Sequence, residues 1–238
     1  MQTETRSVET PDGEMPVYVA HPDEQPSRAV IVIQEAFGVN DHIQDVTRRT
    51  AAAGYLGVAP HVFHRSGGGV VNYGDMEGVM KHFQALSDKG LLDDIDATLG
   101  LIHGEGITDG SVGVVGFCVG GRLTFVAGAE RALGAASSFY GGGIVKGRSE
   151  NMPSLLPAVS HMKTPWLGLF GDLDKGISID DVEELRSALK DAPVETEIVR
   201  YAEAGHGFHC DARPEAYNAE AAADGWRRTL AWFGEHLA

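Results

Sequence analysis

One cysteine stands where the sequence predicts that a strand turns sharply into a helix. Cys118 lies within Gly116-Phe117-Cys118-Val119-Gly120-Gly121, directly after the apolar run Val112–Val115. Small residues on both sides suit a strained turn whose backbone passes close to its neighbours. The same arrangement around a serine is the G-x-S-x-G nucleophile elbow. The spacing therefore predicts a nucleophilic thiol at the tip of the turn; the alternative is a buried, unreactive cysteine.

Three further residues with reactive side chains follow predicted strands. Glu35 comes directly after residues 29–34, Asp174 follows 166–170 through a short turn, and His206 follows 195–201. Because ligands bind outside the carboxyl ends of parallel strands, we expect these side chains to converge with Cys118. The chain order of cysteine, acid and histidine suits a nucleophile, an orienting carboxylate and a proton-carrying imidazole.

Each of these residues also has an ordinary structural interpretation when it is taken alone. Asp174 could cap a turn or a helix, and Asp172 competes with it for the role of the acid. His206 could belong to a glycine-rich loop, and Glu35 could be a surface acid. The joint occurrence of four such residues after four predicted strands favours a catalytic constellation.

The elements that must position these residues alternate between strand and helix patterns. Strands are expected at 17–20, 29–34, 55–59, 112–115, 135–140, 166–170 and 195–201, and helices at 41–53, 91–103, 119–130, 179–189 and 215–236. This alternation with apolar strands predicts an α/β fold, a mostly parallel sheet with helices on both faces. The apolar stripe of the last helix is expected to face the core. With no repeat or linker in view, we expect a single domain over residues 1–238.

Composition excludes several classes of protein. The chain has 238 residues, 43% of them hydrophobic, and a net charge of −15 from 19 basic and 34 acidic residues. That balance argues against a nucleic-acid partner, because phosphate binding needs a basic face. No apolar run approaches the roughly 20 residues that a membrane helix needs. Two cysteines form no disulfide framework, and the polar N-terminus lacks a signal core, so we expect a cytoplasmic protein.

The sequence does not favour a metal site or a phosphate-binding loop. His206-Gly207-Phe208-His209-Cys210, with His61 and His64, offers metal-ligand types, but a zinc site needs three or four convergent ligands and the catalytic interpretation already uses His206. The glycine runs at 67–69 and 141–143 lack the Lys-Ser/Thr pair of a phosphate loop and are expected to be loops near the pocket. No metal and no cofactor is therefore predicted.

The chain resembles a known family, the dienelactone hydrolases (carboxymethylenebutenolidases) of the α/β-hydrolase superfamily. The matching segments are Val32-Ile33-Gln34-Glu35-Ala36-Phe37-Gly38-Val39-Asn40, Gly54-Tyr55 with Ala59-Pro60, Gly116-Phe117-Cys118-Val119-Gly120-Gly121, Gly171-Asp172-Leu173-Asp174 and Ala204-Gly205-His206-Gly207-Phe208. The resemblance implies an α/β-hydrolase fold with Cys118 as nucleophile, His206 as base and Asp174, rather than Asp172, as the orienting acid.

The resemblance also implies roles for residues around the triad. Glu35 would contact the resting thiol and help to convert it to a thiolate when substrate binds. The backbone N–H groups of Ala36 and Val119 would form the oxyanion hole, because the superfamily builds it from the residue after the nucleophile and from an earlier loop.

One departure from the family bears on the substrate. Well-known members hold a substrate carboxylate with two arginines; this chain has Cys210 at one position and no arginine in the region of the other, 73–77. Arg65 and Arg213 are candidates to replace them, although each also suits an ordinary surface position. Phe37 and Tyr140 are further candidates to contact substrate.

The sequence thus predicts a hydrolase that cleaves a small ester or lactone through a Cys-His-Asp triad and a thioester intermediate. A general carboxylesterase or thioesterase without lactone preference is an alternative. A ligand-binding or thiol-sensing protein that keeps the fold without turnover is another. The expected partner is a small-molecule substrate, with neither nucleic acid nor membrane, and the oligomeric state is left open.

Overall fold

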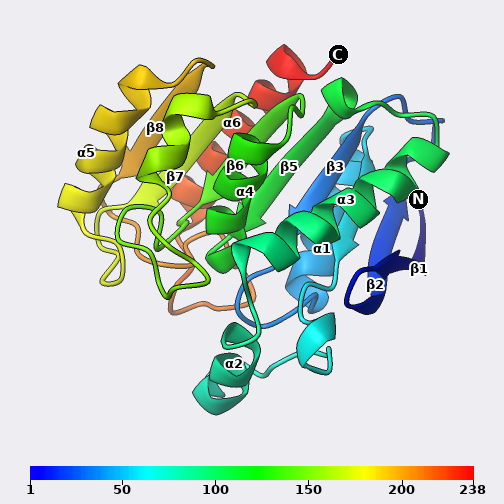
Figure 1. Cartoon of the computed structure of the whole chain (residues 1–238), viewed down its shortest axis with the longest axis horizontal. Helices are drawn as coiled ribbons and strands as arrows, with labels where there is room; N and C mark the ends of the chain where they lie inside the picture. The colour runs from blue at the N-terminus through cyan, green and yellow to red at the C-terminus, as the bar shows by residue number, and fades with distance from the viewer.

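The computed structural model describes residues 1–238 and is organised around one eight-stranded sheet with the strand order β1-β2-β4-β3-β5-β6-β7-β8 (Figure 1). Its strands are β1 Gln2–Thr10, β2 Gly13–His21, β3 Ala29–Ile33, β4 Leu56–Pro60, β5 Val112–Phe117, β6 Ala135–Phe139, β7 Trp166–Gly171 and β8 Thr196–Tyr201. Strands β3 to β8 run parallel to one another, whereas β2 pairs antiparallel with both β1 and β4.

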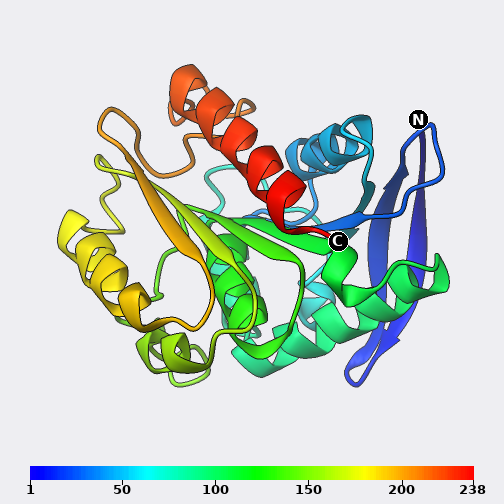
Figure 2. The ribbon, with the colours of Figure 1, turned by 90° about the horizontal axis from the view of Figure 1, so that it is seen from above.

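Helices cover both faces of the sheet. They are α1 Asp41–Ala52, α2 Met76–Phe83, α3 Asp88–Gly104, α4 Val119–Glu130, α5 Ile179–Ala188 and α6 Ala219–His236, with 3-10 turns at His64–Ser66, Asp109–Ser111, Leu156–His161 and Leu189–Asp191. In Figure 2, α1 and α6 lie on one side of the sheet, and α3, α4 and α5 lie on the other. The predicted α/β architecture, with a mostly parallel sheet between two helical layers, is confirmed.

The core lies between these layers. It is a cluster of 61 buried hydrophobic residues, and every residue of β3, β4, β5, β6 and β7 is buried. Apolar strands that are covered on both faces account for the near-continuous hydrophobic runs in the sequence. The stripe of α6 packs into this core, with Phe233 and Leu237 buried and Trp226 and Leu230 partly buried against it.

Two elements were not predicted. Strand β1 is one of the two edge strands, and its side chains are exposed or half-exposed, so no hydrophobic run marks it; pairing with β2 defines it. Helix α2 lies within a polar, glycine-rich region but has an Asp75 N-cap and apolar residues at helical spacing. It is set apart from the layers in Figure 1.

A close backbone approach fixes the turn between β5 and α4. A Cβ atom placed on Gly120 would lie 2.4 Å from the carbonyl oxygen of Ile33 and 2.5 Å from that of Gln34. Only a residue without a side chain allows α4 to begin directly over the end of β3. The glycine therefore sets the distance between the loop after β3 and the tip of the turn.

Substitution of this glycine should be costly. We expect Gly120→Ala to destabilise the fold by about 2 kcal/mol or more, because two backbone carbonyls would have to move. Gly100→Ala, at a position of α3 with nothing near the added Cβ, should instead stabilise by about 0.5–1 kcal/mol. Urea denaturation of both variants measures the difference. Equal unfolding midpoints for the two variants would contradict the packing account.

Candidate active site

The carboxyl ends of four parallel strands bring the predicted residues to one cavity of about 790 Å³. Glu35 follows β3, Cys118 follows β5, Asp174 follows β7 and His206 follows β8, and all four line this cavity. Convergence at this edge is what the parallel sheet requires, since ligand sites in such sheets lie outside the strand carboxyl ends.

Cys118 occupies a strained turn between β5 and α4. Its backbone has φ 57° and ψ −114°, one of only two positive φ values among non-glycine residues. Its N–H donates to the carbonyl of Phe139 on the neighbouring strand at 3.0 Å, which helps to hold this conformation. The side chain is partly exposed to the cavity, so the alternative of a fully buried cysteine does not apply.

Asp174 and His206 form a hydrogen-bonded pair. Asp174 Oδ2 lies 2.6 Å from His206 Nδ1, and its Oδ1 accepts from the backbone N–H groups of Gly176 at 2.7 Å and Ile177 at 3.2 Å. The competing acid is engaged elsewhere: Asp172 accepts two hydrogen bonds from Arg200, at 2.7 and 2.9 Å. Geometry therefore places Asp174, and not Asp172, beside the histidine.

The surroundings of His206 favour its charged form. Burial by itself lowers the pKa of the imidazole, but the neighbouring Cys118 and the Asp174 carboxylate outweigh that effect and raise the pKa to about 10. A histidine that shares protons with a thiol and is oriented by a carboxylate suits proton transfer.

Two backbone N–H groups stand just after β3 and at the start of α4. Ala36 follows β3 and donates no hydrogen bond within the protein. Val119 is the first residue of α4, where N–H groups have no partner inside the helix. Their positions after β3 and after Cys118 are those from which an oxyanion hole is built.

Glu35 has a different partner from the one expected. Its Oε1 accepts a hydrogen bond from Tyr140 Oη at 3.0 Å, its Oε2 is buried without a partner, and no hydrogen bond joins it to Cys118. Tyr140 is fully buried and does not line the cavity, so it is placed to hold Glu35 and not to touch substrate. Burial and the neighbouring Glu35 raise the pKa of Tyr140 well above its ordinary value, which keeps the hydroxyl a donor.

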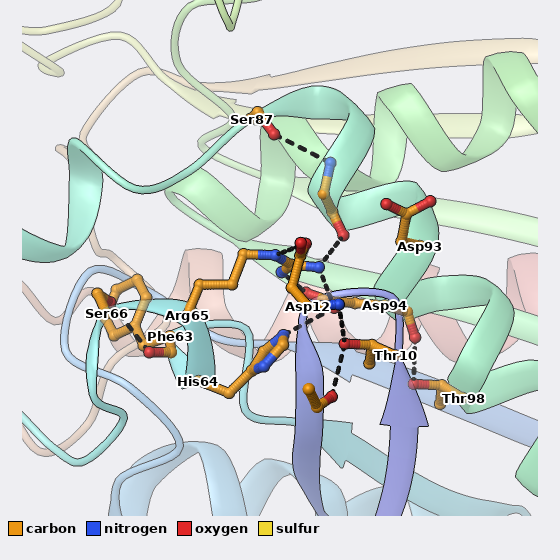
Figure 3. A network of polar contacts seen from close by, with 12 residues as sticks. Thr10, Asp12, Phe63, His64, Arg65, Ser66, Ser87, Asp93, Asp94 and Thr98 are labelled. Atoms are coloured by element: carbon orange, nitrogen blue, oxygen red, sulfur yellow. Dashed lines mark hydrogen bonds and ion pairs between the residues drawn. The ribbon is translucent and has the colours of Figure 1, made fainter.

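Arg65 also lies away from the cavity. Its guanidinium binds the carboxylate of Asp94 at 2.7 Å, that of Asp12 at 2.6 Å and the carbonyl of Gly90 at 2.9 Å, while His64 Nε2 lies 3.0 Å from Asp94 Oδ1 (Figure 3). This network joins the β1–β2 turn to α3. The expectation that Arg65 contacts substrate finds no support in its position.

Arg213 and Phe37, by contrast, line the cavity. The Arg213 guanidinium lies 5.5 Å from the ring centre of Phe37 and 5.6 Å from that of Tyr73. Sequence reasoning did not identify Arg148 and Lys175, two further cations of the cavity, because nothing in their local sequence marks them. It also missed the α2 side chains there, although their spacing was a usable signal.

The second cysteine is not placed to react. Cys210 is buried, with its Sγ 3.5 Å from Tyr73 Oη, and burial together with Glu35 raises the pKa of its thiol to about 11. His209 is also buried, and desolvation lowers its pKa to about 3.

No group of three or more His, Cys, Asp or Glu side chains is arranged to hold a metal ion. None of the helices combines the length and apolar composition needed to cross a bilayer.

Comparison with known proteins identifies the family. Residues 15–237 match the model of the dienelactone hydrolase family. The chain belongs to this family. A Yersinia pestis protein named "Putative carboxymethylenebutenolidase" is 38% identical over 228 residues, which cover 94% of this chain and 84% of that protein. A protein of the same name from Escherichia coli K12 is 36% identical over 235 residues, covering 97% and 86%.

The fold of this dienelactone hydrolase family member agrees with that of a solved homologue. The crystal structure of a dienelactone hydrolase homologue from Klebsiella pneumoniae matches with a TM-score of 0.90, 36% identity and 98% coverage of both chains. Membership of the family makes the protein a hydrolase with the α/β-hydrolase fold that acts on an ester or lactone bond.

Removal of the Asp174 charge should change the titration of His206. Because the carboxylate helps to raise that pKa, we expect Asp174→Asn to lower it from about 10 by at least about one unit, so that the imidazolium is lost at lower pH. Asp172→Asn is the matched control and should leave the titration unchanged. Nuclear magnetic resonance of the ring nitrogens measures both. A shift in the control variant alone would transfer the orienting role to Asp172.

Proposed function

We propose that the protein cleaves a small ester or lactone through a thioester on Cys118, with His206 and Asp174 as its proton-transfer pair. The observation that carries this proposal is the 2.6 Å bond between Asp174 and His206 Nδ1 beside a strained, cavity-lining cysteine. Since Nδ1 is engaged, Nε2 is the ring nitrogen available to the thiol and to substrate.

In the first half of the proposed reaction, the Cys118 thiolate attacks the substrate carbonyl carbon. Negative charge moves to the carbonyl oxygen, where the N–H groups of Ala36 and Val119 would stabilise it. As the tetrahedral intermediate collapses, the bond to the alcohol oxygen breaks and the His206 imidazolium donates its proton to that oxygen. The products of this half are the free alcohol, or the opened ring, and a thioester.

In the second half, water replaces the alcohol. His206, now neutral, takes a proton from a water molecule that attacks the thioester carbon, and the same oxyanion hole holds the developing charge. Collapse breaks the bond between the acyl carbon and Sγ, releases the carboxylic acid, and leaves Cys118 as a thiolate beside the His206 imidazolium. Asp174 keeps Nδ1 protonated throughout, so Nε2 faces the reacting atoms in both halves. The side chains and water supply every group that these steps need.

Substitution of the nucleophile tests the proposal. We expect Cys118→Ala to abolish hydrolysis while the protein stays folded, because a partly exposed turn residue contributes little packing. Cys210→Ala is the matched control and should keep most of the activity. Intact-mass and peptide analysis after a slow ester should place the acyl group on Cys118. An acyl group on Cys210, or full activity in Cys118→Ala, would overturn the mechanism.

Glu35 is proposed to restrain the resting thiol. It is a buried carboxylate at the same cavity, and a nearby negative charge raises the free energy of a thiolate. We therefore expect Glu35→Gln to raise the rate at which iodoacetamide labels resting Cys118 several-fold and to lower hydrolysis. Glu203→Gln makes the same charge change at another cavity residue and should alter neither rate much. Indistinguishable labelling in the wild type and Glu35→Gln would remove Glu35 from the mechanism.

A further inference from the structure

Helix α2 forms an apolar wall of the cavity that the proposed reaction does not use. Its cavity-lining side chains are Met76, Val79, Met80 and Phe83. Met76 is 60% exposed and Met80 is 52% exposed, which is unusual for large apolar residues on a helix that also buries Val79. Methionine side chains adapt their shape to apolar partners, so such a wall suits a flexible or variable ligand group.

This wall is continuous with the reacting groups. Val79 of α2 belongs to a small apolar cluster with Ala36 and Val71, separate from the main core, and Phe37 and Phe83 pack against it. Ala36 is one of the two residues proposed to hold the oxyanion. A substrate whose carbonyl oxygen reaches Ala36 therefore lies next to α2.

Other apolar side chains of the cavity come from the loops that carry the proposed proton-transfer pair. Leu173, 59% exposed, and Tyr217, 40% exposed, line the cavity from the loops that follow β7 and β8, which also carry Asp174 and His206. His206 must reach the leaving alcohol oxygen, so the alcohol part of an ester lies on this side. The acyl part extends from the opposite side of the carbonyl carbon, toward α2.

The size of the cavity supports an extended acyl group. A volume of about 790 Å³ lies in the range of roughly 300–1,000 Å³ that is typical of pockets for drug-sized ligands. A five-membered lactone with few substituents would leave most of the α2 wall in contact with water.

We propose that α2 is the acyl-specificity element of this enzyme, and that its substrates are esters whose acyl part is an apolar chain or ring several carbons long. Met76, Met80 and Phe83 contact that group, and Arg148, whose guanidinium lies 5.7 Å from the centre of the Phe83 ring, closes its outer end. This inference rests on the proposed thioester mechanism, because the mechanism sets which part of the ester faces α2.

Two series of esters test the assignment. The acyl series runs from 4-nitrophenyl acetate to 4-nitrophenyl octanoate, and the alcohol series from ethyl to octyl acetate. In the wild type we expect kcat/KM to rise about two- to fourfold for each added methylene of the acyl series over the first few, since full burial of a methylene corresponds to about fourfold. The alcohol series should show a much smaller rise.

Variants of the wall give the decisive comparison. Met76→Ser and Met80→Ser should flatten the acyl series, so that the ratio of kcat/KM on the octanoate to kcat/KM on the acetate falls at least several-fold from its wild-type value. Met80→Leu should restore the slope. Ile179→Ser changes an apolar residue on α5 that is 41% exposed and lies outside the cavity, and it should keep the wild-type slope.

Several outcomes would overturn the proposal. A flat acyl series in the wild type, or a slope that survives both serine variants, would remove α2 from specificity. A slope confined to the alcohol series would reverse the assignment of the two sides. If size-exclusion chromatography with light scattering showed that Met80→Ser turns an oligomer into a monomer, the methionines would face a second copy of the chain instead. Failure of the thioester mechanism is recognised separately, by activity retained in Cys118→Ala on every ester.

Discussion

The site depends on one close contact, the passage of Gly120 over the carbonyl groups at the end of β3. With no side chain there, α4 begins directly beside β3 and leaves Cys118 at a positive φ of 57°. The same contact sets the N–H group of Val119 near the loop that carries Ala36. The proposed nucleophile and the proposed oxyanion donors are thus positioned by backbone packing at the ends of two buried strands.

Two histidines near the site have very different pKa values because their local surroundings differ. His206 and His209 are three positions apart, yet Cys118 and Asp174 raise the pKa of the first to about 10, whereas burial lowers that of the second to about 3. His209 lies against the aromatic rings of Phe117 and Trp226, and there Asp211 does not offset the effect of desolvation and of the nearby His42 and Arg49. One histidine is therefore equipped to move protons, and the other serves as a neutral packing group.

Much of this arrangement could be predicted because parallel strands carry strong signals. Their apolar runs located the buried strands, and chemistry at their carboxyl ends identified Cys118, Asp174 and His206 as neighbours. Long-range side-chain contacts could not be predicted, since they depend on packing between distant segments. The bond from Tyr140 to Glu35 joins residues 105 positions apart, and Arg65 is held by Asp94 and Asp12. Strand β1 was missed because its side chains are polar and exposed, and α2 was missed because it is short and follows a glycine-rich loop, although its apolar spacing was a usable signal.

The proposed mechanism requires the turn after β5 to supply both the attacking sulfur and one half of the oxyanion hole. A crystal structure of the acyl-enzyme, flash-cooled during turnover of a slowly hydrolysed ester, is the sharpest test. The mechanism predicts continuous density from Cys118 Sγ to the acyl carbon, with the thioester oxygen within about 3.1 Å of the backbone nitrogens of both Ala36 and Val119. An acyl group on another residue, or a thioester oxygen that points away from both nitrogens, would contradict it.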